Sequence, residues 1–305
     1  MSDEVEKRAP IDPETARRVL ALTIDIERVA LGLRSGKHRS AHRGASVVFV
    51  EHREYRPGDD PRLIDWRAYA RNDRHAIKRF EQEAQLGCTL LLDASRSMDF
   101  EGAGAPRTKL EHAAALLAGI VLVLRKQADA VGLVRFAREI ETTLPRRASL
   151  SHVDRVLDAL AMPPAAESGT DLRGALTAAV DRVGRRALVV IASDAIDGAN
   201  DALTPISQLV ARGNEVWFLH VLSPEELELR GEGAARYVGL EREPAVEADP
   251  SVVRAAYLRE VEAFTSSIRA NVTDRGARYR LARTDEPIEK PLAELLLHGR
   301  RARWV

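Results

Sequence analysis

The feature that most constrains this chain is a short, largely apolar stretch followed at once by oxygen-bearing side chains, between Gly87 and Ser97. The run 88–92 ends at Asp93 and is too short for a helix, so it predicts a strand that is buried on both faces. Such strands lie in the middle of parallel sheets. Asp93, Ser95 and Ser97 are therefore expected at the carboxyl end of a central strand, where open α/β sheets bind their ligands.

The residue types in this motif indicate a hard metal ion. Carboxylate and hydroxyl groups offer oxygen donors, which suit Mg²⁺ or Mn²⁺ better than Zn²⁺. The alternative is purely structural, because Asp and Ser are also favoured as N-caps, where they accept hydrogen bonds from free backbone N–H groups. The motif alone does not separate these two interpretations.

Two later stretches favour the metal interpretation. Thr170 precedes Asp171 in a glycine-containing loop, directly before an apolar helix expected over 172–183. A second short apolar strand, expected over 187–192, is followed by a serine and then by Asp194. Together with the first motif, these stretches add a hydroxyl group and a second carboxylate to the possible oxygen donors.

The rest of the chain alternates expected strands with expected helices over short links. Further strands are predicted over 131–136, 215–222 and 279–282, with 140–144 pairing antiparallel beside the first of them. Helices are predicted over 109–126, 153–160, 203–211, 251–272 and 291–300. This order predicts an α/β protein with a doubly wound, mostly parallel sheet and right-handed crossovers.

The order of the oxygen donors resembles the metal-ion-dependent adhesion site of von Willebrand factor A domains. Carried over to this sequence, the resemblance implies that Ser95, Ser97 and Thr170 contact the cation, while Asp93 and Asp194 hold it directly or through water. The sequence departs from that pattern after Asp194, where an alanine stands in place of the glycine found in many such domains. The local turn can therefore differ, and Asp197 becomes a competing carboxylate.

Composition excludes several classes of partner and site. Lys plus Arg equals Asp plus Glu at 46 each, so no overall basic field attracts nucleic acid or anionic lipid. Cys88 is the single cysteine and falls inside the expected central strand, which rules out a disulfide framework. The longest apolar stretch, 113–124, is shorter than the roughly 20 residues of a membrane helix, and the first residues are unlike a signal peptide. We expect a cytoplasmic setting without direct membrane insertion.

The region before the central strand carries a distinctive motif. A Pro-Gly-Asp-Asp turn over 57–60 is followed by Arg62 and by Ile-Asp-Trp over 64–66. Together with the strand that follows, this order resembles the bacterial family called domain of unknown function 58, and the likeness extends over nearly the whole chain. The resemblance implies a family-specific surface whose candidate partner-binding residues are Asp59, Asp60, Arg62, Asp65 and Trp66. Capping, ion pairing and packing are the structural alternatives for these residues.

The expected domain organisation follows from these motifs. Residues 1–84 form a small N-terminal α+β region that carries the Pro-Gly-Asp-Asp and Ile-Asp-Trp motifs. Residues 85–305 form the von Willebrand factor A-like domain, with a polar insertion over 224–250 that is expected to fold as a small excursion of hairpins. The N-terminal region is too small and too charged to complete a core by itself.

Binding is favoured over catalysis, because no nucleophile and no general base can be identified near Asp93. The eight histidines are spread out, and His220, inside an apolar strand, is expected to be a satisfied core residue. The preferred function is a metal-dependent module that binds a carboxylate presented by another protein. The family resemblance implies a partner among MoxR-type AAA+ ATPases, with an adaptor or chaperone-like role in protein maturation. The alternatives are a metal-assisted hydrolase that uses Asp93 and Asp194, with Asp59 or Asp65, and a scaffold without metal.

Overall fold

The computed structural model of the protein describes residues 10–20, 47–54, 69, 76–82, 87–102, 104–164, 171–196, 202–239 and 245–298. The chain divides into two compact units, one made of Met1–Gly36 with Leu86–Val305 and the other of Lys37–Gln85. In the smaller unit, strands β1 (Val47–Glu54) and β2 (Ala76–Gln82) pair antiparallel. The larger unit carries the candidate metal-binding residues.

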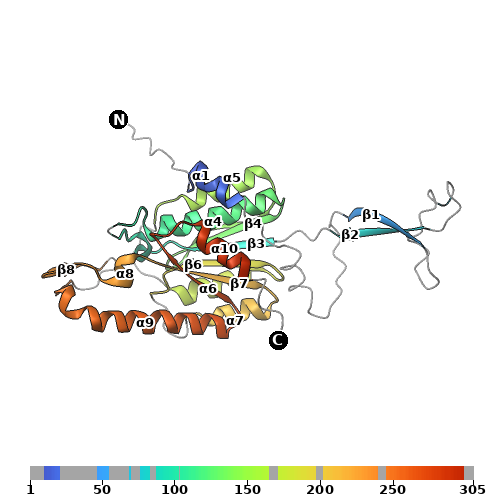
Figure 1. Ribbon diagram of the computed structural model, residues 1–305. Coiled ribbons are helices and arrows are strands. Elements are labelled where there is room, and N and C mark those ends of the chain that lie inside the picture. The colour runs from blue at the N-terminus through green and yellow to red at the C-terminus, as the bar shows by residue number, and fades with distance from the viewer. Residues whose placement is uncertain are drawn as a thin grey trace. The chain divides into compact units, whose positions relative to one another are not determined.

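A six-stranded sheet forms the centre of the larger unit (Figure 1). In chain order its strands are β3 (Gly87–Asp93), β4 (Ala130–Phe136), β5 (Ile140–Arg147), β6 (Leu188–Ser193), β7 (Glu215–Leu222) and β10 (Arg278–Arg283). They lie side by side in the order β10-β7-β6-β3-β4-β5, and every neighbouring pair is parallel except β4 with β5. The doubly wound, mostly parallel α/β sheet predicted from the sequence is confirmed, including its antiparallel edge strand.

The strand order places a topological switch point between β3 and β6. From β3 the chain adds β4 and β5 on one side, and it then returns to add β6, β7 and β10 on the other side. At such a point the loops after the two central strands diverge to opposite faces of the sheet and leave a crevice where ligands bind. Leu92 of β3 pairs with Ala192 of β6, so both strands end at the same level of the sheet.

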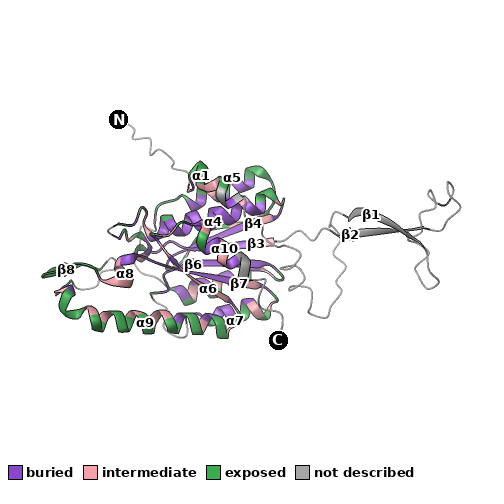
Figure 2. Cartoon of the chain, in the orientation of Figure 1, coloured by how far each residue is buried: buried purple, intermediate pink, exposed green. Residues whose placement is uncertain are grey.

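Helices cover both faces of the sheet and produce two separate cores (Figure 2). On one face lie α1 (Pro13–Leu20), α4 (Lys109–Lys126), α5 (Leu150–Leu160) and α10 (Glu289–His298); on the other lie α6 (Leu172–Val183), α7 (Thr204–Ala211) and α9 (Pro250–Asp274). In β3, Leu90 and Leu92 join the first core and Leu91 the second, as the two-residue period of a strand requires. The central strand is therefore apolar on both faces, as its sequence predicted.

Helix α4 is the most deeply buried helix on its face. Thr108 caps its N-terminus by accepting a hydrogen bond from the Glu111 backbone, and the Glu111 side chain returns a bond to the Thr108 N–H. From Leu110 to Leu124 nearly all of its side chains are buried against the sheet and the neighbouring helices. Its first residue, Lys109, is buried as well, and this is unusual for a lysine.

The N-terminal helix belongs to the larger unit, which differs from the expected boundary at residue 84. Val19 of α1 is fully buried in the core of the first face, and α1 packs against α4 and α10. The larger unit accordingly includes Met1–Gly36, and the smaller one consists of Lys37–Gln85. A short amphipathic helix is stabilised mainly by the surface on which it packs, and that surface lies far ahead in the sequence.

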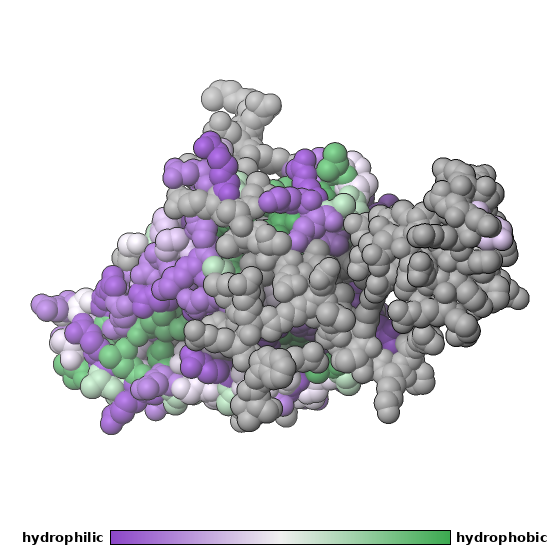
Figure 3. All heavy atoms as spheres, turned by 45° about the vertical axis from the view of Figure 1, so that its right-hand side comes forward, coloured by the Kyte–Doolittle hydropathy of each residue, from purple (hydrophilic) through white to green (hydrophobic). Residues whose placement is uncertain are grey.

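The polar insertion forms a short helix and a hairpin. Helix α8 (Pro224–Glu228) follows β7, and strands β8 (Ala235–Tyr237) and β9 (Val246–Ala248) pair antiparallel before α9 begins. Exposed apolar side chains occur at the hairpin and the first turns of α9, namely Tyr237, Val238, Val246, Val252, Val253 and Leu258. On the face shown in Figure 3, the described residues are mostly hydrophilic, with smaller hydrophobic areas between them. None of the helices in the described ranges combines the length and the apolar character that crossing a membrane requires.

Candidate functional site

The first part of the candidate site lies at the end of β3. Asp93 is buried, and its Oδ1 accepts a hydrogen bond of 3.0 Å from the backbone N–H of Ser95. The Oγ atoms of Ser95 and Ser97 lie 3.0 Å apart, in and beside the short 3-10 helix η2 (Arg96–Asp99). Ser95 is the N-cap of η2, yet its side chain makes no capping hydrogen bond. Capping therefore does not explain the Ser95 hydroxyl, which faces Ser97 instead.

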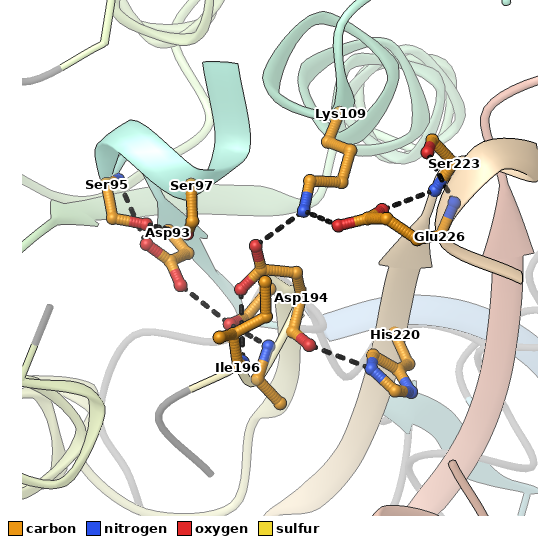
Figure 4. Close-up of polar contacts among 11 residues, drawn as sticks. Asp93, Ser95, Ser97, Lys109, Asp194, Ile196, His220, Ser223 and Glu226 are labelled. Carbon is orange, nitrogen blue, oxygen red and sulfur yellow. Dashed lines mark hydrogen bonds and ion pairs between the residues drawn. The ribbon is translucent and has the colours of Figure 1, made fainter. Parts of the chain in front are cut away.

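The second part lies at the end of β6, directly beside the first. Ser193 Oγ donates a 2.6 Å hydrogen bond to Asp93 Oδ2 and accepts one of 3.0 Å from the Ala195 N–H. Asp194 follows, and its Oδ1 accepts a hydrogen bond of 3.2 Å from the Ile196 N–H. The structure thus brings Asp93, Ser95 and Asp194 to one edge of the sheet (Figure 4).

The alanine that stands where glycine was expected does adopt a glycine-like conformation. Ala195 has a φ of 51°, in the left-handed region that favours glycine. The turn after Asp194 is therefore formed in spite of the substitution, with the strain of a Cβ atom in that region. Asp197, the competing carboxylate, lies outside the described residues.

A buried lysine joins the site from α4, and sequence reasoning did not identify it. Lys109 Nζ lies 2.8 Å from Asp194 Oδ2 and 2.6 Å from Glu226 Oε1, and the Lys109 side chain is 1% exposed. The other carboxylate oxygen of Glu226 accepts a hydrogen bond from the Ser223 N–H at the start of α8. Figure 4 shows Lys109 between the two carboxylates. The only signal in the sequence for a buried lysine is its position as the first residue of a largely apolar helix.

Burial and neighbouring charges give these groups unusual proton affinities. Burial, and then the charge of Asp194, raise the pKa of Asp93 to about 7, and hydrogen bonds from Ser193 and Ser95 only partly oppose them. Burial disfavours the charged form of Lys109, but the carboxylates of Asp194 and Glu226 outweigh it and raise the pKa of Lys109 above its ordinary value. Asp194 is thus paired with a cation, whereas Asp93 has only neutral hydrogen-bond donors among the described contacts.

A neutral histidine supports the backbone of Asp194. His220 Nε2 lies 2.8 Å from the Asp194 carbonyl oxygen, and Nδ1 lies 2.8 Å from the Tyr279 hydroxyl. Burial lowers the pKa of His220 to about 4, so the ring is neutral near pH 7. Because a carbonyl oxygen only accepts, Nε2 carries the proton and Nδ1 accepts from Tyr279. The expectation that His220 is a satisfied core residue is confirmed.

The loop that carries Thr170 lies outside the described residues, but the structure defines both of its ends. Asp171 caps α6, with Oδ1 accepting a 2.7 Å hydrogen bond from the Gly174 N–H. On the other side, the buried guanidinium of Arg135 donates hydrogen bonds to the carbonyl oxygens of Ala159, Met162 and Pro163. The candidate partner-binding residues Asp59, Asp60, Arg62, Asp65 and Trp66 also lie outside the described residues.

The donor set fits a hard cation. Asp93, Ser95, Ser97 and Asp194 present only oxygen atoms, which Mg²⁺ and Mn²⁺ prefer. The described residues contain no group of three or more His, Cys, Asp or Glu side chains that could hold a metal ion. A site here would therefore depend on serine hydroxyls together with two carboxylates. Asp93 lacks a cationic partner among its described contacts, so a bound cation would stabilise the negative charge of its carboxylate the most.

Comparison with known proteins identifies relatives of this chain. An uncharacterized protein of Mycobacterium tuberculosis is 28% identical over 282 residues, which cover 90% of this chain and 86% of the relative, and a Mycobacterium bovis protein matches equally well.

Solved structures with some similarity include BatB from Bacteroides thetaiotaomicron, with a TM-score of 0.48, 18% identity, and coverage of 71% of this chain and 100% of that one. An aerotolerance-related membrane protein from Bacteroides fragilis has a TM-score of 0.46, 20% identity, and coverage of 68% and 96%. The VWA domain of SpRpn10 has a TM-score of 0.41, 9% identity, and coverage of 69% and 95%. Because all three TM-scores are below 0.5, nothing about function follows from these similarities. The model of one protein family, described as protein of unknown function DUF58, matches residues 51–266, and the chain therefore belongs to the DUF58 family.

Proposed function

We propose that this protein is a metal-dependent protein-binding module, with a site of the metal-ion-dependent adhesion type formed by Asp93, Ser95, Ser97, Thr170 and Asp194. The observation that carries the proposal is the convergence of two carboxylates and two serine hydroxyls at the switch point between β3 and β6. Mg²⁺ is the proposed cation and Mn²⁺ its alternative, because every donor is an oxygen atom. Bound there, the ion would supply a positive charge that an acidic side chain of another protein can approach.

The residues of the chain divide the work within such a site. Asp93 and Asp194 supply the negative charge, and the Ser193 and Ile196 contacts fix their orientation. Ser95 and Ser97 add neutral oxygens, so the donor set carries less negative charge than a cluster of carboxylates. A weakly charged site retains affinity for an external carboxylate, and this favours binding of a partner over tight storage of metal.

The proposed partner is a protein that presents a carboxylate, with a MoxR-type AAA+ ATPase as the suspected class. The family resemblance supports this partner, together with an adaptor or chaperone-like role in protein maturation. A cytoplasmic setting, expected from the sequence, is part of the proposal as well. The exposed apolar side chains of the β8–β9 hairpin and the first turns of α9 agree with a protein-interaction role. The motif from Pro57 to Trp66 would provide the family-specific surface.

Calorimetric titration with Mg²⁺ and Mn²⁺ tests the site directly. We expect heat of binding for the wild type and an affinity weakened at least about tenfold for Ser95→Ala, because that change removes a proposed ligand. Ser149→Ala is the matched control, since Ser149 is exposed and makes no capping bond with its side chain. Absence of binding by the wild type would leave a scaffold without metal as the answer.

A pull-down tests the partner. Wild type and Asp93→Ala would each be incubated with a purified MoxR-type ATPase, with Mg²⁺ and with a chelator. We expect retention only by the wild type and only with Mg²⁺. Equal retention in all four samples would exclude a metal-dependent contact with that partner.

One observation favours a second candidate, a metal-assisted hydrolase that uses Asp93 and Asp194. Asp93 is a buried carboxylate without a cationic partner among its described contacts, and in the metal-free protein its pKa is raised to about 7, the range in which a carboxylate serves as a general base near neutral pH. Turnover of phosphate or peptide esters by the wild type, abolished by Asp93→Asn, would support this candidate. Absence of turnover in a protein that binds Mg²⁺ would favour the binding module.

A further inference from the structure

Lys109 is in an unusual position for a cation. It is the first residue of α4, where the helix dipole favours negative rather than positive charge. It is also fully buried, and burial of an ammonium group is unfavourable unless anions compensate it. Two carboxylates do so, Asp194 at 2.8 Å and Glu226 at 2.6 Å. The contacts of this lysine therefore bear directly on a residue of the proposed metal site.

The ammonium group reduces the negative charge that the site can offer to another cation. Of the two carboxylates at the switch point, Asp194 is paired with Lys109 through Oδ2, and its Oδ1 accepts the Ile196 N–H. The Lys109 ammonium group, 2.8 Å from Asp194 Oδ2, would repel a divalent cation bound to Asp194. It would also compete with that cation for the same carboxylate. Glu226 acts in the opposite direction, because it holds Lys109 from the side away from Asp194 (Figure 4).

We propose that Lys109 is an internal competitor of the metal ion, and that Glu226 sets the strength of this competition by sharing the ammonium group. The proposal rests on the proposed function, because it concerns the affinity of the same site for Mg²⁺. Glu226 also binds the Ser223 N–H at the start of α8, and the Tyr257 hydroxyl of α9 donates a 2.8 Å hydrogen bond to the Glu226 carbonyl oxygen. The position of α8 against α9 is thereby connected to the charge at the metal site.

The two single substitutions are expected to have opposite effects on metal affinity. Lys109→Met keeps an unbranched side chain without charge, so Oδ2 of Asp194 becomes available to the metal ion. Mg²⁺ affinity should then rise at least about tenfold, as expected for removal of one unit charge within about 6 Å. Glu226→Gln leaves Asp194 as the only ionised partner of Lys109, so Mg²⁺ affinity falls. If Lys109 and Glu226 only stabilised the local structure, both substitutions would instead weaken the binding of Mg²⁺.

The double substitution distinguishes action through Lys109 from a simple effect of charge. If Glu226 acts by holding Lys109, then Glu226→Gln changes the affinity little in a protein that already carries Lys109→Met. If Glu226 acts on the ion independently, the two effects add. Lys126→Met and Glu260→Gln are the charge-matched controls, because both residues are exposed and Lys126 lies about 25 Å away at the other end of α4. Neither control should change the affinity.

The dissociation constant for Mg²⁺ would be measured by calorimetry on the full chain, with Mn²⁺ binding by electron paramagnetic resonance as a second readout. Unchanged or weaker binding by Lys109→Met, with binding by the wild type intact, overturns the proposal and leaves the metal site standing. If Lys109→Met fails to fold, Glu226→Gln provides the test. Unchanged or tighter binding of Mg²⁺ by that variant would also overturn the proposal. If neither the wild type nor any variant binds either ion, the proposed function and this inference both fail.

Discussion

The buried carboxylate of Asp93 gives the sharpest test of whether this edge of the sheet is built for a cation. Without a metal, burial and then the charge of Asp194 disfavour the ionised carboxylate in the folded protein, and they raise the pKa of Asp93 from 3.8 to about 7. Asp93→Asn removes this charge and keeps the shape of the side chain. The Asn oxygen can still accept the Ser95 N–H, and the Ser193 hydroxyl can accept from the amide. We therefore expect the variant to be more stable than the wild type in a chelator.

The size of the effect follows from the pKa. A difference of about 3 in pKa between the folded and unfolded states corresponds to about 4 kcal/mol at a pH above both values. Relaxation around the carboxylate reduces this figure, so an increase of about 1 to 4 kcal/mol in the free energy of unfolding is expected at pH 8.

The pH dependence provides an internal control. Between about pH 4 and pH 7 the folded protein holds the Asp93 proton more tightly than the unfolded chain does, so this residue makes the free energy of unfolding fall as the pH rises. At pH 4 the folded wild type is protonated at Asp93 and resembles the variant. The stability difference between the two proteins should therefore be small at pH 4, grow through pH 7 and level off above it.

Urea unfolding followed by circular dichroism measures the difference, in a chelator and at several pH values. Asp154→Asn, which removes an exposed carboxylate from α5, is the control and should change the stability little at any pH. A loss of stability in Asp93→Asn at pH 8 would refute the reasoning, because it would show that the ionised Asp93 carboxylate stabilises the metal-free fold instead of destabilising it.

Three further results are expected. Mg²⁺ should raise the midpoint of thermal unfolding of the wild type but not of Asp93→Asn, and its affinity should increase from pH 6 to pH 8 as Asp93 loses its proton; equal shifts in both proteins, or no dependence on pH, would contradict this. Arg135→Lys should lower the free energy of unfolding by about 2 kcal/mol in urea titrations, because a lysine cannot hold the carbonyl groups that the guanidinium holds, whereas Arg138→Lys at an exposed position should have little effect. Tyr279→Phe should cost about 1 kcal/mol by leaving Nδ1 of His220 without its donor, and an unchanged midpoint in urea would contradict this assignment.

The class of fold, and the position of the candidate oxygen donors at the end of a strand, could be predicted from the amino-acid sequence alone. The stretch from Gly87 to Ser97 was sufficient to predict a central strand with oxygen donors at its end, because strand length, burial pattern and ligand type are local properties. Asp194 is added by the resemblance to von Willebrand factor A domains, and it lies beside Asp93 because β3 and β6 are neighbouring parallel strands that end at one edge of the sheet.

Which charged side chains meet at this edge of the sheet depends instead on the three-dimensional fold. Lys109 is separated from Asp194 by 85 positions and from Glu226 by 117, and nothing local in the sequence indicates such pairs. They form because α4 begins beside the ends of β6 and β7, and the burial of that edge makes each charge depend on the others. Likewise, the raised pKa of Asp93 is a property of its enclosure and of Asp194, not of its position in the chain.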